Sequence, residues 1–343
     1  MNNTKKTMPE HLLTELQRQD VYLGELPDGY EFPVFSGKQA VESQRKSNYK
    51  TTAHAAREIV DNALEAGSST VWIALQRVDE ARRKKHQPRD TVTGVAFIDD
   101  GPGMKPNMAR LALSWGGGTH AKEPNFIGKF GFGLPNSSIN QTRRVEVYTK
   151  TAADRSWSMT YLDIHEVPQF GKVTVPEPVE AELPRFVLDY IERKKLTLDS
   201  GTIVAWVNPD RLSHSTSSNL RKALIEDFGV TYRYLLDEFS IIVEDVLVKP
   251  VDPLFLMEES LFFVPEEEGG AKCTFERELP VRYWRDRGTG APRLEILEDS
   301  SAFYKRDDLH EDRLDVAIGS VRVRVARFPV GFVQGAKGAS GDP

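Results

Sequence analysis

Glu58 and Asn62 lie four residues apart in the segment REIVDN, and residues at this spacing share one face of a helix. A carboxylate at such a place can act as a general base toward water. A carboxamide offers a neutral oxygen ligand to Mg²⁺, which prefers oxygen and commonly bridges phosphates. On its own, such a pair is in most proteins an exposed polar helix face, so further residues are needed to indicate a site.

Asp99 stands in the string IDDGPGM, directly before a turn that contains Gly101, Gly103 and Met104. A carboxylate only accepts hydrogen bonds, so Asp99 can take the exocyclic amine of adenine. Glycines have no side chain and let a flat base lie against the backbone. An ordinary Asp-Gly turn produces the same string, and taken alone this is its more common meaning.

The string IGKFGFG contains Gly128, Lys129, Phe130, Gly131 and Gly133, and it precedes a segment that we expect to be helical. Backbone N–H groups at the start of a helix bind phosphate oxygens. Lys129 would add a positive charge there, although a solvated lysine is an equally good interpretation. The string is neither a Walker loop nor a dinucleotide fingerprint, because it lacks the residue order of both.

Two further features complete this set. Thr202 follows a glycine at the start of an expected strand, SGTIVAWV, and its hydroxyl can reach a base through water. Taken alone, a β-branched residue in a strand is its more common interpretation. The connection from Met104 to Gly128 contains three more glycines, and we expect it to be a mobile cover that closes over a ligand and excludes water.

The elements that must position these residues follow from the apolar pattern. The segment TTAHAAREIVDNALEAG has apolar residues every three or four positions and stops at Gly67, which predicts a helix that carries Glu58. Residues 215–246 predict a second helix that leads into a strand. Strands are expected in STVWIALQRV, TGVAFIDDG, RRVEVYTK, SWSMTYLDI and GTIVAWV. Together these elements predict an α/β fold with a mixed sheet.

The length of 343 residues favours two domains, and 39% apolar and 28% charged residues are ordinary for a globular chain. We expect a polar N-terminal arm over residues 1–45, with a short helix near residues 9–18. A first domain is expected at 46–212, because the stretch near 208–218 is rich in turn formers. The second domain, 213–343, is expected to be incomplete, because the chain ends in the loop QGAKGASGDP.

Composition also excludes several classes of protein. The net charge of −6 excludes a strongly basic nucleic-acid coat. No apolar run approaches the length of about 18–20 residues that a membrane helix needs, and the polar N-terminus is unlike a secretory signal. Cys273 is the single cysteine, which excludes an internal disulfide and a zinc site built on several thiolates. We therefore expect a cytoplasmic protein with no membrane partner.

Taken together and in this order, the four segments resemble the Bergerat-fold (GHKL) ATPases, the superfamily of gyrase, heat-shock chaperone, histidine kinase and mismatch-repair ATPases. EIVDNALEAG looks like the N-box, DDGPGM the adenine box, IGKFGFGL the glycine box that closes the lid, and SGT the final threonine box. Within the superfamily, the run over residues 116–150 looks most like bacterial relatives of the MORC ATPases. The resemblance covers residues 45–210 firmly and the rest loosely.

The resemblance implies a two-layer α/β (α+β) sandwich, with a mixed β-sheet covered by helices and a smaller transducer-like α/β domain after it. Glu58 would match the catalytic glutamate, Asn62 the Mg²⁺ ligand, and Asp99 the adenine-binding aspartate. Lys337 is the candidate for a transducer lysine at the γ-phosphate, with a plain tail lysine as the alternative. The remaining residues implied to bind ATP are Gly101, Gly103, Met104, Gly128, Lys129, Phe130, Gly131, Gly133 and Thr202.

The implied function is Mg²⁺-dependent ATP binding and slow hydrolysis, which close the lid and clamp a homodimer on DNA or a protein client. One alternative is an ATP-binding subunit that does not hydrolyse ATP. Another is a histidine kinase, but only His11 precedes the N-box as an acceptor, and such kinases often carry Asn where Glu58 stands. His54, one turn before Glu58, is expected to be a packed or orienting residue.

DNA contact would need basic side chains, and two basic runs occur at Arg82–Lys85 and Arg193–Lys195. Such runs are most commonly solvated faces or loops. Contact with phosphates would make binding fall steeply with salt. Trp206 and Trp284 are expected in the core rather than as stacking platforms.

Overall fold

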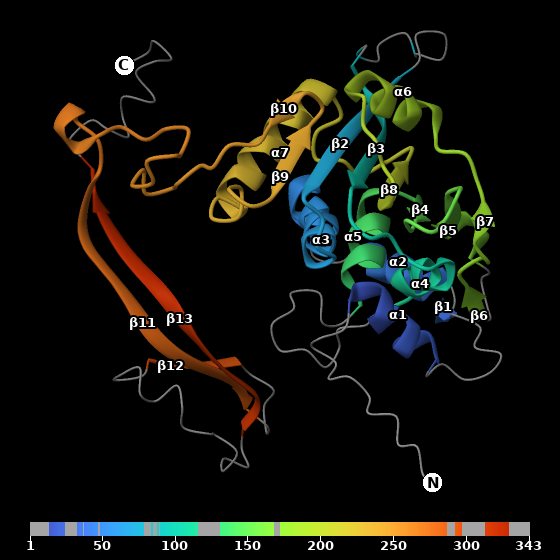
Figure 1. Ribbon diagram of the computed structural model, residues 1–343, viewed down its shortest axis with the longest axis horizontal. Coiled ribbons are helices and arrows are strands. Elements are labelled where there is room, and N and C mark those ends of the chain that lie inside the picture. The colour runs from blue at the N-terminus through green and yellow to red at the C-terminus, as the bar shows by residue number, and fades with distance from the viewer. Residues whose placement is uncertain are drawn as a thin grey trace. The chain divides into compact units, whose positions relative to one another are not determined.

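The structure is a computed structural model. It describes residues 14–24, 33–36, 38–46, 49–78, 84, 88, 90–115, 131–167, 172–286, 292–296 and 313–328. The chain divides into two compact units, Met1–Lys249 and Pro250–Pro343. A large mixed sheet belongs to the first unit and a smaller sheet to the second (Figure 1). Across the described ranges, no helix combines the length and the apolar character that crossing a membrane requires.

A mixed sheet forms the centre of the first unit. Its strand order among the described residues is β10-β9-β2-β3-β8-β4-β5-β7. Neighbouring strands run antiparallel, except that β9 runs parallel to β2. The mixed sheet predicted from the sequence is therefore confirmed. The strands are β2 (Thr70–Arg77), β3 (Val92–Asp99), β4 (Arg144–Lys150), β5 (Ser158–Asp163), β7 (Val179–Glu180), β8 (Gly201–Val207), β9 (Ser240–Val243) and β10 (Val246–Leu247).

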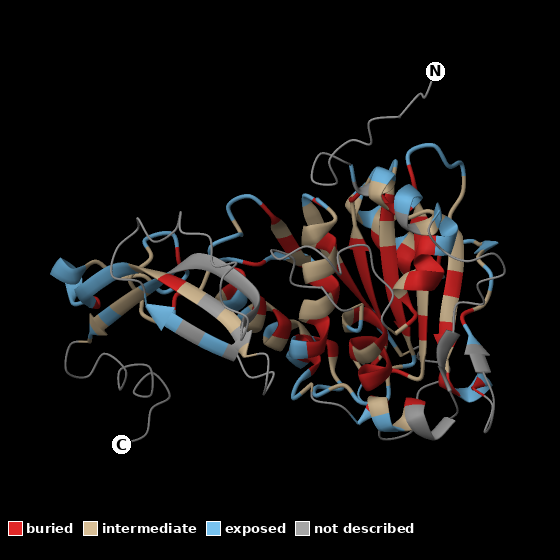
Figure 2. Ribbon diagram, turned by 90° about the horizontal axis from the view of Figure 1, so that it is seen from below, coloured by how far each residue is buried: buried red, intermediate tan, exposed pale blue. Residues whose placement is uncertain are grey.

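Both faces of this sheet are apolar, because side chains alternate along each strand. In β2, Ile73 and Leu75 belong to one buried cluster, whereas Ala74 belongs to another with Tyr190. Trp206 is fully buried, as predicted, and buried residues gather in the central strands (Figure 2). Helices therefore cover this sheet, as expected. Several of them pack on the first face, and a further helix packs on the second face. The helices on the first face include α3 (Thr52–Glu65), α5 (Gly133–Gln141) and α7 (Ser217–Thr231), and α6 (Arg185–Lys194) packs on the second.

The described parts of the first 45 residues pack on the first unit. Helix α1 (Glu15–Gly24) contacts α4 (Pro106–Ala112), and α2 (Lys38–Arg45) contacts α5. Strand β1 (Pro33–Ser36) pairs antiparallel with β6 (Lys172–Thr174). The short helix expected near residues 9–18 corresponds to α1, which begins and ends later in the chain. These residues are therefore built into the unit, whereas the sequence suggested a separate arm.

The two units divide at Lys249–Pro250, whereas the sequence placed a domain boundary after residue 212. Helix α7 belongs to the first unit because Arg57 of α3 donates two hydrogen bonds of 2.7 Å to the carboxylate of Asp227 in α7. Strand β9 belongs there because it pairs with β2. The helix expected in the second domain is therefore part of the first unit.

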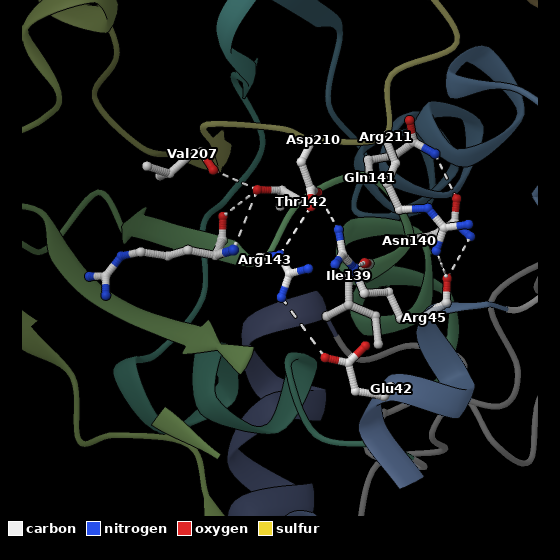
Figure 3. A network of polar contacts seen from close by, with 11 residues as sticks. Glu42, Arg45, Ile139, Asn140, Gln141, Thr142, Arg143, Val207, Asp210 and Arg211 are labelled. Carbon is white, nitrogen blue, oxygen red and sulfur yellow. Dashed lines mark hydrogen bonds and ion pairs between the residues drawn. The ribbon is translucent and has the colours of Figure 1, made fainter. Parts of the chain in front are cut away.

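The turn-rich stretch after β8 is held by polar contacts at the C-terminal end of α5 (Figure 3). Arg45 of α2 is 4% exposed; its Nε donates to the carbonyl of Ile139 at 3.0 Å, and its guanidinium pairs with Asp210. The N–H groups of Asp210 and Arg211 donate to the carbonyl of Gln141 at 3.1 and 3.2 Å. These bonds satisfy carbonyls that have no partner inside the helix. The stretch after β8 has a composition typical of a linker, but its residues belong to a structural network.

The described residues of the second unit form a three-stranded antiparallel sheet in the order β12-β11-β13. Asp252 accepts hydrogen bonds from the N–H groups of Leu254 and Leu256, and Arg324 of β13 lies 3.5 Å from its carboxylate. Among its described residues this unit has no α-helix, because the helix that suggested an α/β second domain is α7. The strands are β11 (Lys272–Asp286), β12 (Pro292–Ile296) and β13 (Arg313–Arg327).

We predict that Arg45→Met lowers the free energy of unfolding by about 2–4 kcal/mol, because the Ile139 carbonyl and the Asp210 carboxylate lose their partner. Urea denaturation followed by circular dichroism measures this change. The control is Glu42→Gln, which removes a carboxylate 3.9 Å from Arg143 with both side chains more than a third exposed. This control should change stability by less than about 0.5 kcal/mol. Equal effects of the two substitutions would contradict a structural role for the network.

Candidate functional site

Helix α3 carries both Glu58 and Asn62, and its ends follow the sequence closely. The side chain of Thr51 accepts the N–H of His54 at 3.1 Å and caps the helix start. The helix ends before Gly67, whose φ of +82° suits a glycine. The helix expected from the apolar rhythm is confirmed. The buried stripe that fixes its face consists of Ala55, Ile59 and Ala63.

The carboxylate of Glu58 lies against the first turn of α5. A Cβ built on Gly133, the first residue of α5, would come within 2.4 Å of Glu58 Oε2. The first turn of a helix has N–H groups without helical partners and favours negative charge. Asn62 follows one turn later on α3, and its side chain makes no hydrogen bond to the described part of the chain. Predicted residues from the N-box and the glycine box thus meet at the start of α5.

Tyr49 holds Glu58 from another side, and the sequence did not indicate this residue. Its hydroxyl lies near the Glu58 carboxylate, and burial together with this carboxylate raises the pKa of Tyr49, so the hydroxyl stays protonated. The ring of His54 meets the Tyr49 ring edge-on, with centroids 5.6 Å apart and planes at 77°. An aromatic residue just before the helix cap was the only available signal.

Asp99 is a partly buried residue at the end of β3. Its Oδ1 accepts hydrogen bonds from the N–H of Gly101 at 2.9 Å, the N–H of Thr202 at 3.1 Å and the Ser68 hydroxyl at 3.3 Å. Burial raises its pKa to about 6, although these three bonds act in the opposite direction. Ser68 comes directly after the end of α3. The ends of α3 and β3 and the start of β8 therefore meet at one oxygen atom.

The neighbouring Asp100 has a structural role. Its Oδ1 accepts the N–H groups of Ser69 and Thr70 at 2.8 and 2.9 Å, and its other oxygen accepts the Ser69 hydroxyl. These contacts fix the turn that leads into β2. The two adjacent aspartates therefore have different partners: Asp100 binds the turn before β2, and Asp99 binds Gly101, Thr202 and Ser68. The sequence pattern alone does not reveal this difference.

The loop after Asp99 is fixed by close backbone approaches. Gly103 has a φ of +71°, and a Cβ added to it would lie 2.1 Å from the carbonyl of Lys150, so this position requires glycine. The hydroxyl of Thr149 accepts the N–H of Met104 at 2.6 Å and donates to its carbonyl at 3.2 Å. The hydroxyl of Ser200 donates to the carbonyl of Gly101 at 2.8 Å. The predicted adenine loop is thus anchored on β4 and on the start of β8.

The structure brings Thr202 to Asp99. Its backbone N–H binds Asp99, and the expected contact of its hydroxyl with a base stays a prediction. Gly131 has a φ of +60° and precedes α5. The predicted binding residues Gly128, Lys129, Phe130 and Lys337 lie outside the described residues.

The described basic run at the end of α6 is engaged in local contacts. Lys194 lies 2.6 Å and Arg193 3.8 Å from the carboxylate of Asp245, and the Arg193 guanidinium lies 5.3 Å from the centre of the Tyr190 ring. Lys195 ends the helix with a φ of 54°. These contacts give this run structural tasks. Of the other run, only Lys84 is among the described residues.

The comparison with known families agrees with this geometry. Residues 49–195 match the model of the family described as histidine kinase-, DNA gyrase B-, and HSP90-like ATPase. No curated protein matched the chain. The matched range includes α3, the loop after β3, and α5, together with strands β2, β3, β4, β5 and β7 of the mixed sheet, and the mixed sheet covered by helices agrees with this fold. This part of the chain is therefore similar to GHKL-type ATPase domains, and the similarity supports ATP binding and hydrolysis as a general activity.

Proposed function

We propose that this protein binds ATP with Mg²⁺ and hydrolyses it slowly, with Glu58 as the general base. One observation carries the proposal: the Glu58 carboxylate lies between the Tyr49 hydroxyl and the first turn of α5, at Gly133. Helix N-termini bind phosphate groups. A positioned base beside such a terminus, within the family-matched range, supports attack of water on a phosphate.

Asp99 is proposed to bind the exocyclic amine of adenine. All three of its described hydrogen bonds go to Oδ1, so Oδ2 accepts none from the described residues. A donor from the ligand would stabilise this partly buried carboxylate further. Gly101 beside it has to be small, since a Cβ there would lie only 2.6 Å from the Ser68 hydroxyl and 2.9 Å from Asp99 Oδ1. The residues present therefore fit an adenine nucleotide.

In the proposed reaction, Glu58 accepts a proton from a water as the water oxygen attacks the γ-phosphorus, and the bond from that phosphorus to the bridging oxygen of ADP breaks. The nearby Tyr49 hydroxyl is a protonated donor that would help to orient the base. Asn62 would supply an oxygen ligand to Mg²⁺, which neutralises charge on the phosphates. Contacts of Lys129 and Lys337 with the phosphates stay predictions from the sequence.

We propose further that ATP closes the connection between Met104 and Gly128 over the nucleotide and joins two copies into a clamp. The closer resemblance to MORC ATPases supports this step, and that resemblance is itself a prediction from the sequence. A DNA or protein client also stays a prediction. The described basic run at residues 193–195 gives it little support, because Arg193 and Lys194 already face Asp245.

Two alternative functions would use the same adenine site but would not need Glu58 as a general base. A non-hydrolysing subunit would bind ATP without releasing phosphate. A histidine kinase would transfer the γ-phosphoryl group to a histidine. The contact of Tyr49 with Glu58 favours hydrolysis over both, because neither alternative requires an oriented carboxylate at this position.

Glu58→Gln should leave the Kd for ATP nearly unchanged and reduce the rate of phosphate release by about 10²–10⁴-fold, because the amide cannot accept the proton from water. Single-turnover phosphate release and calorimetric titration with ATP measure the two quantities. Glu65→Gln, at the last residue of the same helix, is the matched control and should hydrolyse normally. A Glu58→Gln protein with the parent rate would refute the assignment of the base.

The affinity for adenosine should fall as the pH is lowered through about 6, the raised pKa of the partly buried Asp99 carboxyl. Only the ionised carboxylate accepts the adenine amine, so we expect about a tenfold loss from pH 7 to pH 5. Adenosine is the suitable ligand because it has no titrating phosphate. Asp99→Asn should bind adenosine poorly at every pH. A flat pH profile for the unmodified protein would contradict this role.

Light scattering should report the mass of a dimer when Mg²⁺ and a non-hydrolysable ATP analogue saturate the protein, and a monomer without nucleotide. Asp99→Asn should remain monomeric under both conditions, because it cannot hold the base. The same mass with and without the analogue would refute the clamp while leaving ATP hydrolysis in place.

A further inference from the structure

Helix α1 reaches the loop that carries the predicted adenine-binding residues, although it lies upstream of the family-matched range 49–195. Its residue Gln19 is 2% exposed. The Gln19 Oε1 atom accepts the N–H of Lys105 at 3.0 Å, and its Nε2 lies 3.5 Å from the carbonyl of Gly103 and donates toward it. Both ends of one buried carboxamide therefore engage the same loop.

Other contacts of α1 place Gln19 there. Asp20 pairs with the ammonium group of Lys105. Leu23 packs against Met108 and Leu111, which are 5% and 1% exposed in α4. In Figure 1, α1 lies next to α4, in agreement with their packing. Besides the Gln19 carboxamide, an apolar contact and an ion pair therefore dock this helix.

Gln19 and Thr149 fix Met104 from its two sides. Thr149 binds both backbone groups of Met104, while Gln19 binds the carbonyl before it and the N–H after it. Gly103 has a positive φ, and a glycine peptide is the most freely rotating part of a loop. Without Gln19, two backbone groups of this loop would lose their partner, and a ligand would have to order the loop when it binds.

We propose that Gln19 is a positioning residue for the adenine nucleotide, so that α1 sets nucleotide affinity from outside the family-matched range. This inference rests on the proposed ATP-binding function. Gln19 acts through the loop between Asp99 and Lys105 and has no described contact with Glu58. Loss of its hydrogen bonds should therefore raise the KM and the Kd for ATP and leave kcat nearly unchanged.

The test compares Gln19→Met with the full-length parent protein. Methionine keeps the length and apolar stem of the side chain but forms neither hydrogen bond, so α1 can stay packed. We expect the KM and the Kd for ATP to rise by about 5–20-fold, with kcat at saturating ATP within about twofold of the parent. Val21→Ala, at a residue 47% exposed on the same helix, is the matched control and should leave both constants unchanged.

A direct readout is hydrogen exchange at the Lys105 amide without nucleotide. Its exchange should accelerate in Gln19→Met and not in Val21→Ala, because only the first substitution removes its acceptor. Leu23→Ala provides a second route, since it weakens the docking of α1 without altering the carboxamide. It should also raise KM with little change in kcat, which keeps the test decisive if Gln19→Met folds poorly.

The outcomes separate the inference from the function beneath it. If the parent protein binds ATP and both Gln19→Met and Leu23→Ala bind it with the parent Kd, the role of α1 is refuted and the ATPase proposal stands. A lowered kcat at unchanged KM would also refute the inference. If the parent protein itself fails to bind ATP, the proposed function falls, and the role of Gln19 falls with it.

Discussion

The partly buried carboxylate of Asp99 is the constraint on which the rest of the site depends. Its Oδ1 accepts three hydrogen bonds, from Gly101, Thr202 and Ser68, and these donors come from the loop after β3, the start of β8 and the residue after α3. A buried carboxylate without donors is strongly unfavourable, so these segments hold one another in place. Burial still raises the pKa of Asp99, so the donors offset only part of the desolvation. A site in this condition favours a ligand that brings one more donor.

Helix α5 imposes a second constraint, because other parts of the chain contact both of its ends. Its first residue, Gly133, leaves room for the carboxylate of Glu58. Its last carbonyls, at Ile139 and Gln141, accept hydrogen bonds from the network around Arg45 (Figure 3). A helix of 9 residues is a short, stiff rod of about 13 Å, so contacts that fix one end also fix the other. The network therefore contributes to the geometry at Glu58 without touching it.

The parts of this site that follow from the sequence are those in which neighbours along the chain decide the structure. The buried stripe of α3, its stop at Gly67 and the glycine turn after Asp99 are of this kind. Tyr49, Ser68 and Gln19 were not indicated, because each acts on a residue that is distant in the sequence, up to 84 positions away for Gln19 and Gly103. The stretch after β8 was misjudged for a related reason. Polar residues and turn formers are typical of linkers, but here they cap α5, and only the fold shows which carbonyls they meet.

The range that matches the family model, residues 49–195, is not held in place by its own residues alone. Apart from Lys337, the residues that the sequence motifs predict to face the nucleotide fall within residues 49–195 or close to it. The backbone of the same loops and helices also has an outer side, whose polar groups need partners that the nucleotide cannot provide. Those partners come from Gln19 and Arg45 before the matched range, and Asp227 after it binds the Arg57 side chain of α3. They decide how firmly the motif residues are held before any ligand arrives. The part of the chain that holds the motif residues is therefore larger than the matched range, and this is the physical basis for our proposal that residues outside it influence nucleotide affinity.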